Sequence, residues 1–211
     1  MKKEKYNETE RHEYIIQKCD SVNAKKVLDV GCGNGTRLTN ELADWGFKVV
    51  GIDIDKPSIE DANRLKGKRK NPIYKNECIS EHADKHDVIL ALGVLEHLPD
   101  KTLDLYLSEM NTIGDYFIFS IPYGYSSSEF IGRLGKYKNK ILTFLGLKKL
   151  WMSPMPDSTC NLEGNMHVQY FTFKRFCNLL DKYGYDIVES HKFYRTILPQ
   201  QFIFFCKKRE Q

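Results

Sequence analysis

The stretch that decides the fold reads Val27-Leu28-Asp29-Val30-Gly31-Cys32-Gly33-Asn34-Gly35. Its first four residues form a short, mostly apolar run of the kind found in buried parallel strands. Three glycines at alternate positions follow, and glycine permits positive φ and a close approach of a ligand to the backbone. The spacing of apolar residues beyond the glycines predicts a helix, whose first N–H groups have no partner within the helix. The stretch therefore predicts a strand, a ligand-binding turn and a helix.

Two acidic residues distinguish this turn from a pyrophosphate-binding loop. The spacing is Asp-x-Gly-x-Gly-x-Gly, whereas dinucleotide enzymes use Gly-x-Gly-x-x-Gly. Asp29 precedes the glycines, where a carboxylate would repel a pyrophosphate but can attract the amino group of an amino acid. Asp53 ends a second apolar run, and a carboxylate there can accept both hydroxyls of a ribose. Together the two carboxylates indicate a ligand that joins a nucleoside to an amino acid without a phosphate.

The rest of the chain alternates apolar runs with amphipathic segments. Strands are predicted at 27–30, 49–53, 73–75, 88–92, 116–121, 187–194 and 202–207. Helices are predicted at 8–19, 101–112 and 172–183, with one more carrying Leu38, Leu42 and Trp45 on one face and another beginning at Asp55 and Pro57. This order predicts an α/β fold: a Rossmann-like, mostly parallel seven-stranded sheet with helices on both faces and a C-terminal antiparallel hairpin.

Length and composition agree with one domain over residues 1–211. Hydrophobic residues make up 41% and charged residues 28%, which allows a packed core. We expect a cytoplasmic protein, because no apolar run is long enough to span a membrane and the charged N-terminus lacks a secretory signal. Six scattered cysteines without a CxxC pair indicate mostly buried thiols in a reducing compartment. The net charge of +4 is too small to indicate nucleic-acid binding by itself.

Three further stretches complete a resemblance. They are Leu95-Glu96-His97-Leu98-Pro99-Asp100, His167-Val168-Gln169-Tyr170-Phe171-Thr172, and Leu179-Leu180-Asp181-Lys182-Tyr183-Gly184-Tyr185. With the glycine turn, they resemble the class I S-adenosylmethionine-dependent methyltransferases, in the small-molecule branch related to ubiquinone-pathway enzymes. The resemblance covers residues 25–122 and 165–207.

The resemblance implies S-adenosylmethionine as the cofactor and a role for each matching residue. Gly31, Gly33 and Gly35 would shape the cofactor loop, and Asp29 would orient the methionine end. Asp53 would hold the ribose, and Glu77 would contact the adenine amino group. Leu92 and Gly93 would line the methionine moiety through their backbone.

Glu96, His97 and His167 are the candidate catalytic residues, because a base with a pKa near neutrality helps when the acceptor is a hydroxyl. The alternative for each is a purely structural role, in which neighbouring residues of a turn or loop satisfy its hydrogen bonds. Some ubiquinone-pathway relatives bind a metal through this Glu-His pair and a carboxylate three residues earlier. Gly93 stands there in this sequence, so no metal is expected. His82 and His86 lie in a polar stretch, which predicts that both are solvated.

Residues 123–168 interrupt the alternation and predict an insertion that acts as a lid. Within it, apolar residues recur at helical spacing among lysines and arginine over 130–149. This segment could contact an anionic membrane surface, but we favour a lid with a solvated basic face.

A small molecule is the expected acceptor, because no nucleic-acid-binding module is evident. Two alternatives stay open: an RNA or protein methyltransferase that docks through the basic insertion, and a non-catalytic cofactor-binding partner subunit. The sequence does not decide among oxygen, nitrogen and carbon acceptors, and it does not fix the oligomeric state.

Overall fold

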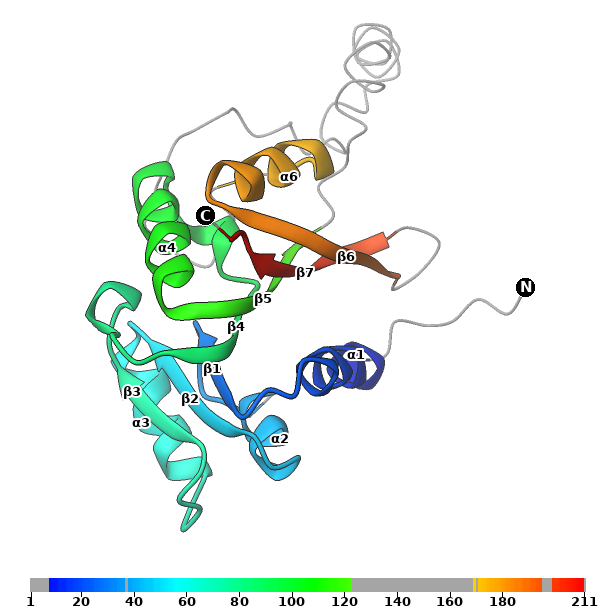
Figure 1. The fold of residues 1–211 in the computed structure, drawn as a ribbon. Helices are drawn as coiled ribbons and strands as arrows, with labels where there is room; N and C mark the ends of the chain where they lie inside the picture. Colours follow the sequence, from blue (N-terminus) through cyan, green and yellow to red (C-terminus); the bar gives the residue numbers. More distant parts are fainter. Residues whose placement is uncertain (1–7, 37, 123–168, 170, 195–198, 211) are drawn as a thin grey trace, which may run out of the picture.

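The computed structural model describes residues 8–36, 38–122, 169, 171–194 and 199–210. The predictions for the insertion at 123–168, including His167 and the basic segment 130–149, lie outside the described residues. Seven strands form one sheet in the order β3-β2-β1-β4-β5-β7-β6 (Figure 1). Their bounds are β1 Lys26–Val30, β2 Lys48–Asp53, β3 Ile73–Asn76, β4 His86–Leu92, β5 Gly114–Pro122, β6 Tyr185–Tyr194 and β7 Pro199–Lys208.

The sheet is mostly parallel, as the sequence predicts. Strands β1 to β5 pair in parallel, and β7 is antiparallel to both of its neighbours, β5 and β6. The C-terminal hairpin therefore inserts β7 beside β5 and leaves β6 at the edge of the sheet. All seven predicted strands are present, each extended by one to several residues.

Helices cover both faces of the sheet (Figure 1). Their bounds are α1 Glu8–Ser21, α2 Thr39–Asp44, α3 Lys56–Leu65, α4 Asp100–Ile113 and α6 Phe173–Lys182, with two 3-10 turns, η1 Ile79–Glu81 and η2 Leu95–His97. One core joins α4 and α6 to the sheet through Leu107, Phe119 and Phe176. The opposite core joins α1 and α2 to the sheet through Ile15 and Leu42.

The prediction that Trp45 shares the inward face of α2 with Leu38 and Leu42 is wrong. Trp45 is 64% exposed, whereas both leucines are buried. Helix α2 is short and ends at Asp44, so Trp45 is already its C-cap and does not continue the buried face.

The carboxyl ends of the parallel strands meet at one edge of the sheet. Residues that follow β1, β2, β3 and β4 therefore lie near one another, as do the end of β5 and the beginning of β7, where Pro122 pairs with Gln201. Open parallel sheets bind ligands at this edge. No helix in the described part of the chain is long and apolar enough to cross a membrane.

Candidate functional site

The glycine turn follows β1 as predicted, and its glycines differ in their surroundings. Gly31, Gly33 and Gly35 all have positive φ, between +54° and +71°. A Cβ on Gly35 would lie 1.9 Å from the Tyr74 hydroxyl, and one on Gly31 would lie 2.4 Å from Val94. A Cβ on Gly33 would meet nothing within 4 Å. Gly31 and Gly35 are thus fixed by packing, whereas Gly33 faces open space that a ligand can enter.

Asp53 lies beside this turn, at the end of β2. Its Oδ2 accepts a hydrogen bond from the Gly33 N–H at 2.8 Å, and its Oδ1 accepts one from the Asp55 N–H at 2.8 Å. The next residue, Ile54, is 67% exposed although it is strongly apolar. A partly exposed carboxylate followed by an exposed apolar side chain suits a sugar hydroxyl next to a flat apolar ring. The sequence analysis did not single out Ile54 for this role.

Asp29 is almost fully buried at the end of β1. The Thr39 hydroxyl donates to its Oδ2 at 2.5 Å. Burial raises the pKa of Asp29 to about 6, while the Thr39 hydrogen bond opposes this rise, as does the Arg11 charge more weakly. A buried carboxylate with a raised pKa gains from a cationic ligand, because such a partner offsets the cost of burying the negative charge.

Arg11 is a buried cation whose charge acts on Asp29, and the sequence analysis did not single it out. It lies on α1, is only 9% exposed, and its guanidinium donates to Gln201 Oε1 of β7 at 3.4 Å. The neighbouring His12 is hydrogen-bonded to Glu41 of α2 at 2.6 Å. The only sign of Arg11 in the sequence is a polar residue on a helix face that is otherwise buried. The position of Arg11 near the edge of the sheet depends on contacts between the two ends of the chain.

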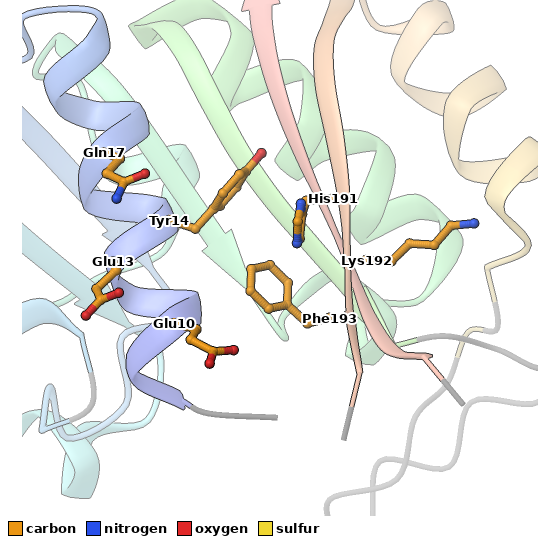
Figure 2. Close-up of a pocket in the computed structure, with 7 residues that line it drawn as sticks. All are labelled: Glu10, Glu13, Tyr14, Gln17, His191, Lys192 and Phe193. Atoms are coloured by element: carbon orange, nitrogen blue, oxygen red, sulfur yellow. The ribbon is translucent and has the colours of Figure 1, made fainter. Parts of the chain in front are cut away.

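Aromatic side chains hold α1 against the C-terminal hairpin (Figure 2). The ring centroid of Tyr14 lies 5.2 Å from that of His191 and 5.7 Å from that of Phe193. Together with Glu10, Glu13, Gln17 and Lys192, these rings line a pocket of about 240 Å³. This pocket contains none of the predicted site residues, and its aromatic wall instead anchors the helix that carries Arg11.

The turn after β4 carries the candidate catalytic pair. Gly93 has a φ of +71°, and a Cβ there would lie 3.7 Å from Glu96 Oε1. Glu96 is 3% exposed, its Oε2 has no hydrogen-bond partner among the described residues, and burial raises its pKa. His97 is half-buried. The described residues contain no group of three or more side chains placed to hold a metal ion.

Gln169 connects the end of the insertion to this turn. Its N–H donates to the Glu96 carbonyl at 2.8 Å. Its side-chain amide donates to the Leu98 carbonyl at 2.9 Å and to Asp100 Oδ1 at 2.8 Å, and it accepts from Arg175 at 2.8 Å. A buried amide with this many partners fixes the chain that returns from the insertion beside Glu96.

The prediction that His82 and His86 are solvated is wrong. Both are buried, and their Nε2 atoms lie 2.9 Å apart. His82 Nδ1 is hydrogen-bonded to Glu77 Oε1. The link between β3 and β4 has no α-helix and crosses the face of the sheet through η1, so its polar residues turn inward. Glu77 follows Asn76, which pairs with Asp53 in the sheet, so the predicted adenine contact lies beside the predicted ribose contact.

A family model described as a methyltransferase domain matches residues 8–190. Among curated proteins, the ubiquinone biosynthesis O-methyltransferase of Proteus mirabilis is 36% identical over 95 residues, which cover 43% of this chain and 38% of that protein. The enzyme of the same description from Actinobacillus pleuropneumoniae is 38% identical over 99 residues, which cover 43% of this chain and 42% of that protein. The match thus spans about two fifths of the length of these relatives.

Solved structures share the fold at low sequence identity. The S-adenosylmethionine-dependent methyltransferase of Clostridium acetobutylicum has a TM-score of 0.68 at 14% identity, covering 97% of this chain and 93% of that chain. The magnesium protoporphyrin IX methyltransferase of Synechocystis PCC 6803 with bound SAH has a TM-score of 0.65 at 16% identity, covering 94% of this chain and 82% of that chain. These likenesses confirm the predicted Rossmann-like fold.

Proposed function

This chain belongs to the methyltransferase domain family, with the class I S-adenosylmethionine-dependent fold, and from that premise we propose that it transfers a methyl group from this cofactor to a small-molecule acceptor. The observation that carries the proposal is the edge of the sheet where Asp29, Gly33 and Asp53 meet: a buried carboxylate, an open backbone turn and a second carboxylate. These are the groups needed for an amino acid joined to a nucleoside.

The residues present suit the cofactor. Asp29 would accept the methionine ammonium, and the buried Arg11 guanidinium would attract the methionine carboxylate. Asp53 would hold the ribose hydroxyls and Glu77 the adenine amino group, with Ile54 against the ring. Gly33 leaves room for this ligand because it has no side chain.

When bound, the cofactor supplies a methyl group already activated for displacement on its sulfonium. The chain then has to align the acceptor with that methyl group and exclude water. Leu92 and Gly93 lie at the end of β4, where their backbone would border the methionine moiety. Glu96 lies over Gly93 with a raised pKa and an unpartnered oxygen, so it can accept a proton from a hydroxyl or ammonium acceptor. His97 and His167 are the other candidate bases.

The small-molecule acceptor is supported by the curated relatives, whose description is ubiquinone biosynthesis O-methyltransferase. No metal enters the proposal, because Gly93 provides no carboxylate to complete a set with Glu96 and His97. The proposal does not include a membrane contact or an oligomeric state.

Isothermal titration with S-adenosylmethionine, for the wild type and Asp53→Ala, tests the cofactor site. We expect micromolar binding by the wild type and a loss of about tenfold or more in the variant, since a carboxylate hydrogen bond contributes roughly 1.5–3 kcal/mol. Unchanged affinity would remove Asp53 from the site.

A library of small acceptors with radiolabelled cofactor tests the reaction. Methyl transfer to RNA alone would contradict the proposed small-molecule acceptor.

A further inference from the structure

Glu77, His82 and His86 form a buried chain that the proposed reaction does not use directly. His82 Nδ1 is hydrogen-bonded to Glu77 Oε1, and His82 Nε2 lies 2.9 Å from His86 Nε2. The planes of the two imidazole rings are inclined by 29°, and their centroids lie 5.1 Å apart. At the far end of the chain, His86 Nδ1 is buried and has no partner among the described residues.

With both imidazoles neutral and Glu77 ionised, one arrangement of hydrogens satisfies both contacts. If Glu77 is a carboxylate, His82 Nδ1 must carry the hydrogen that it donates. His82 Nε2 can then accept the hydrogen of His86 Nε2, which leaves a lone pair on the buried His86 Nδ1.

Burial disfavours the cationic form of His86. Burial, followed by the neighbouring His82, lowers the pKa of His86 to about 4, while Asp84 and Asp87 oppose this and Lys26 adds to it. At the other end, Lys75 Nζ lies 3.6 Å from Glu77 Oε1. The cation and His82 both face Oε1, and no hydrogen bond of Glu77 Oε2 is formed within the described part of the chain.

We propose that His82, held in one tautomer by His86, is a positioning residue that orients the Glu77 carboxylate so that its second oxygen can accept the exocyclic amino group of adenine. The inference rests on the proposed function, because it needs the adenine to lie beside Asp53 and Glu77. In this arrangement, the preference for adenine over other nucleobases depends on two histidines that do not themselves touch the cofactor.

The test compares two nucleosides that differ at the recognised group: S-adenosylhomocysteine and S-inosylhomocysteine, in which an oxygen replaces the amino group. We expect the wild type to prefer the adenosyl ligand by about tenfold to a hundredfold, the range for a hydrogen bond to a charged group. His82→Leu should lose most of this preference, because it removes the donor to Glu77. His82→Asn should retain it, since the amide nitrogen can occupy the place of Nδ1. Lys68→Leu, at an exposed position in the turn between α3 and β3, is the control and should behave as the wild type.

The outcomes separate this inference from the proposed function. Failure of the wild type to bind either nucleoside would overturn both. Binding with an unchanged preference in His82→Leu would overturn the inference alone.

If His82→Leu does not fold, nitrogen-15 NMR of the wild-type histidine side chains gives a second test. We expect hydrogens on His82 Nδ1 and His86 Nε2, with and without S-adenosylhomocysteine. A hydrogen on His82 Nε2 in place of Nδ1 would contradict the arrangement.

Discussion

At the scale of single residues, Gly33 and Gly35 have similar backbone conformations but should respond differently to a side chain. Gly33→Ala places a methyl group in open space at a φ of +54°, which costs about 1–2 kcal/mol of stability. The folded variant should bind S-adenosylmethionine at least about tenfold more weakly, because the methyl group occupies the space of the ligand. Thermal melting and titration calorimetry measure the two effects separately.

Gly35→Ala is the comparison variant for this prediction. Its Cβ would lie 1.9 Å from the buried Tyr74 hydroxyl, so it should destabilise the protein by about 3 kcal/mol or more. Equal losses of stability in the two variants, with equal cofactor affinity, would show that the turn only shapes the fold.

The raised pKa of Asp29 makes cofactor binding depend on pH. In the proposed site the Asp29 carboxylate attracts the cofactor ammonium, and the negative charge of Asp29 is lost as the pH falls through about 6. Affinity should therefore be constant above about pH 7 and fall by up to about tenfold per pH unit below 6. Titrations between pH 5 and 8 measure it, and a flat profile in the wild type would exclude Asp29 as the ammonium partner.

The raised pKa of Asp29 has the opposite effect on the stability of the free protein. Because the folded state binds the Asp29 proton more tightly than the unfolded state does, this residue stabilises the fold at low pH. That contribution is lost as the pH rises through about 6. Asp29→Asn removes the buried charge and can still accept from Thr39. It should raise the free energy of unfolding at pH 7.5 by about 1 kcal/mol and abolish the pH dependence of cofactor affinity.

At the scale of secondary-structure elements, the strands could be predicted because short apolar runs bounded by turn residues are typical of strands buried on both faces of a parallel sheet. The ends of the strands were less certain, since β4 begins at His86, which the sequence placed in a solvated loop. Polarity alone misplaced His82 and His86, because their burial depends on Glu77 and on each other. Arg11 was missed because its partner Gln201 is 190 residues away, and nothing local in the sequence indicates that contact.

The η2 turn and helix α6 should be coupled through Gln169. Gln169→Met keeps the length and burial of the side chain and the backbone hydrogen bond to Glu96, but removes the bonds to Leu98, Asp100 and Arg175. We expect the KM for the acceptor to rise several-fold and the Kd of the cofactor to change less than about twofold, since the amide borders the Glu96 side of the site. Steady-state kinetics and calorimetry measure these quantities.

Lys174→Met, on the exposed face of α6, is the control for Gln169→Met. It should leave both quantities as in the wild type. A weaker cofactor affinity with an unchanged acceptor KM in Gln169→Met would contradict this prediction. Gln169 would then act on the binding of the cofactor and not on that of the acceptor.

At the scale of the whole molecule, the acceptor should be selected by residues 123–168. Strand β5 ends at Pro122, at the edge of the sheet where the proposed site lies, and the chain is next described at Gln169, beside Glu96. The sequence between them is rich in aromatic residues and lysines. Substrate choice commonly resides in loops that a rigid sheet carries, so we propose that the aromatic residues select an apolar or aromatic small molecule.

Neutralising the basic residues of 130–149 separates this proposal from docking on RNA or on a membrane. A variant with glutamine at Arg133, Lys136, Lys138, Lys140, Lys148 and Lys149 should keep the wild-type KM for a small acceptor, because aromatic contacts do not depend on these charges. RNA binding would instead be lost in the variant and would weaken steeply with salt in the wild type. Adsorption to anionic vesicles would also be lost, since it depends on the same charges. The measurements are acceptor kinetics at 50 and 200 mM salt, with co-sedimentation of RNA and of vesicles. Tight, salt-sensitive RNA binding by the wild type, together with methyl transfer to that RNA, would overturn the small-molecule proposal.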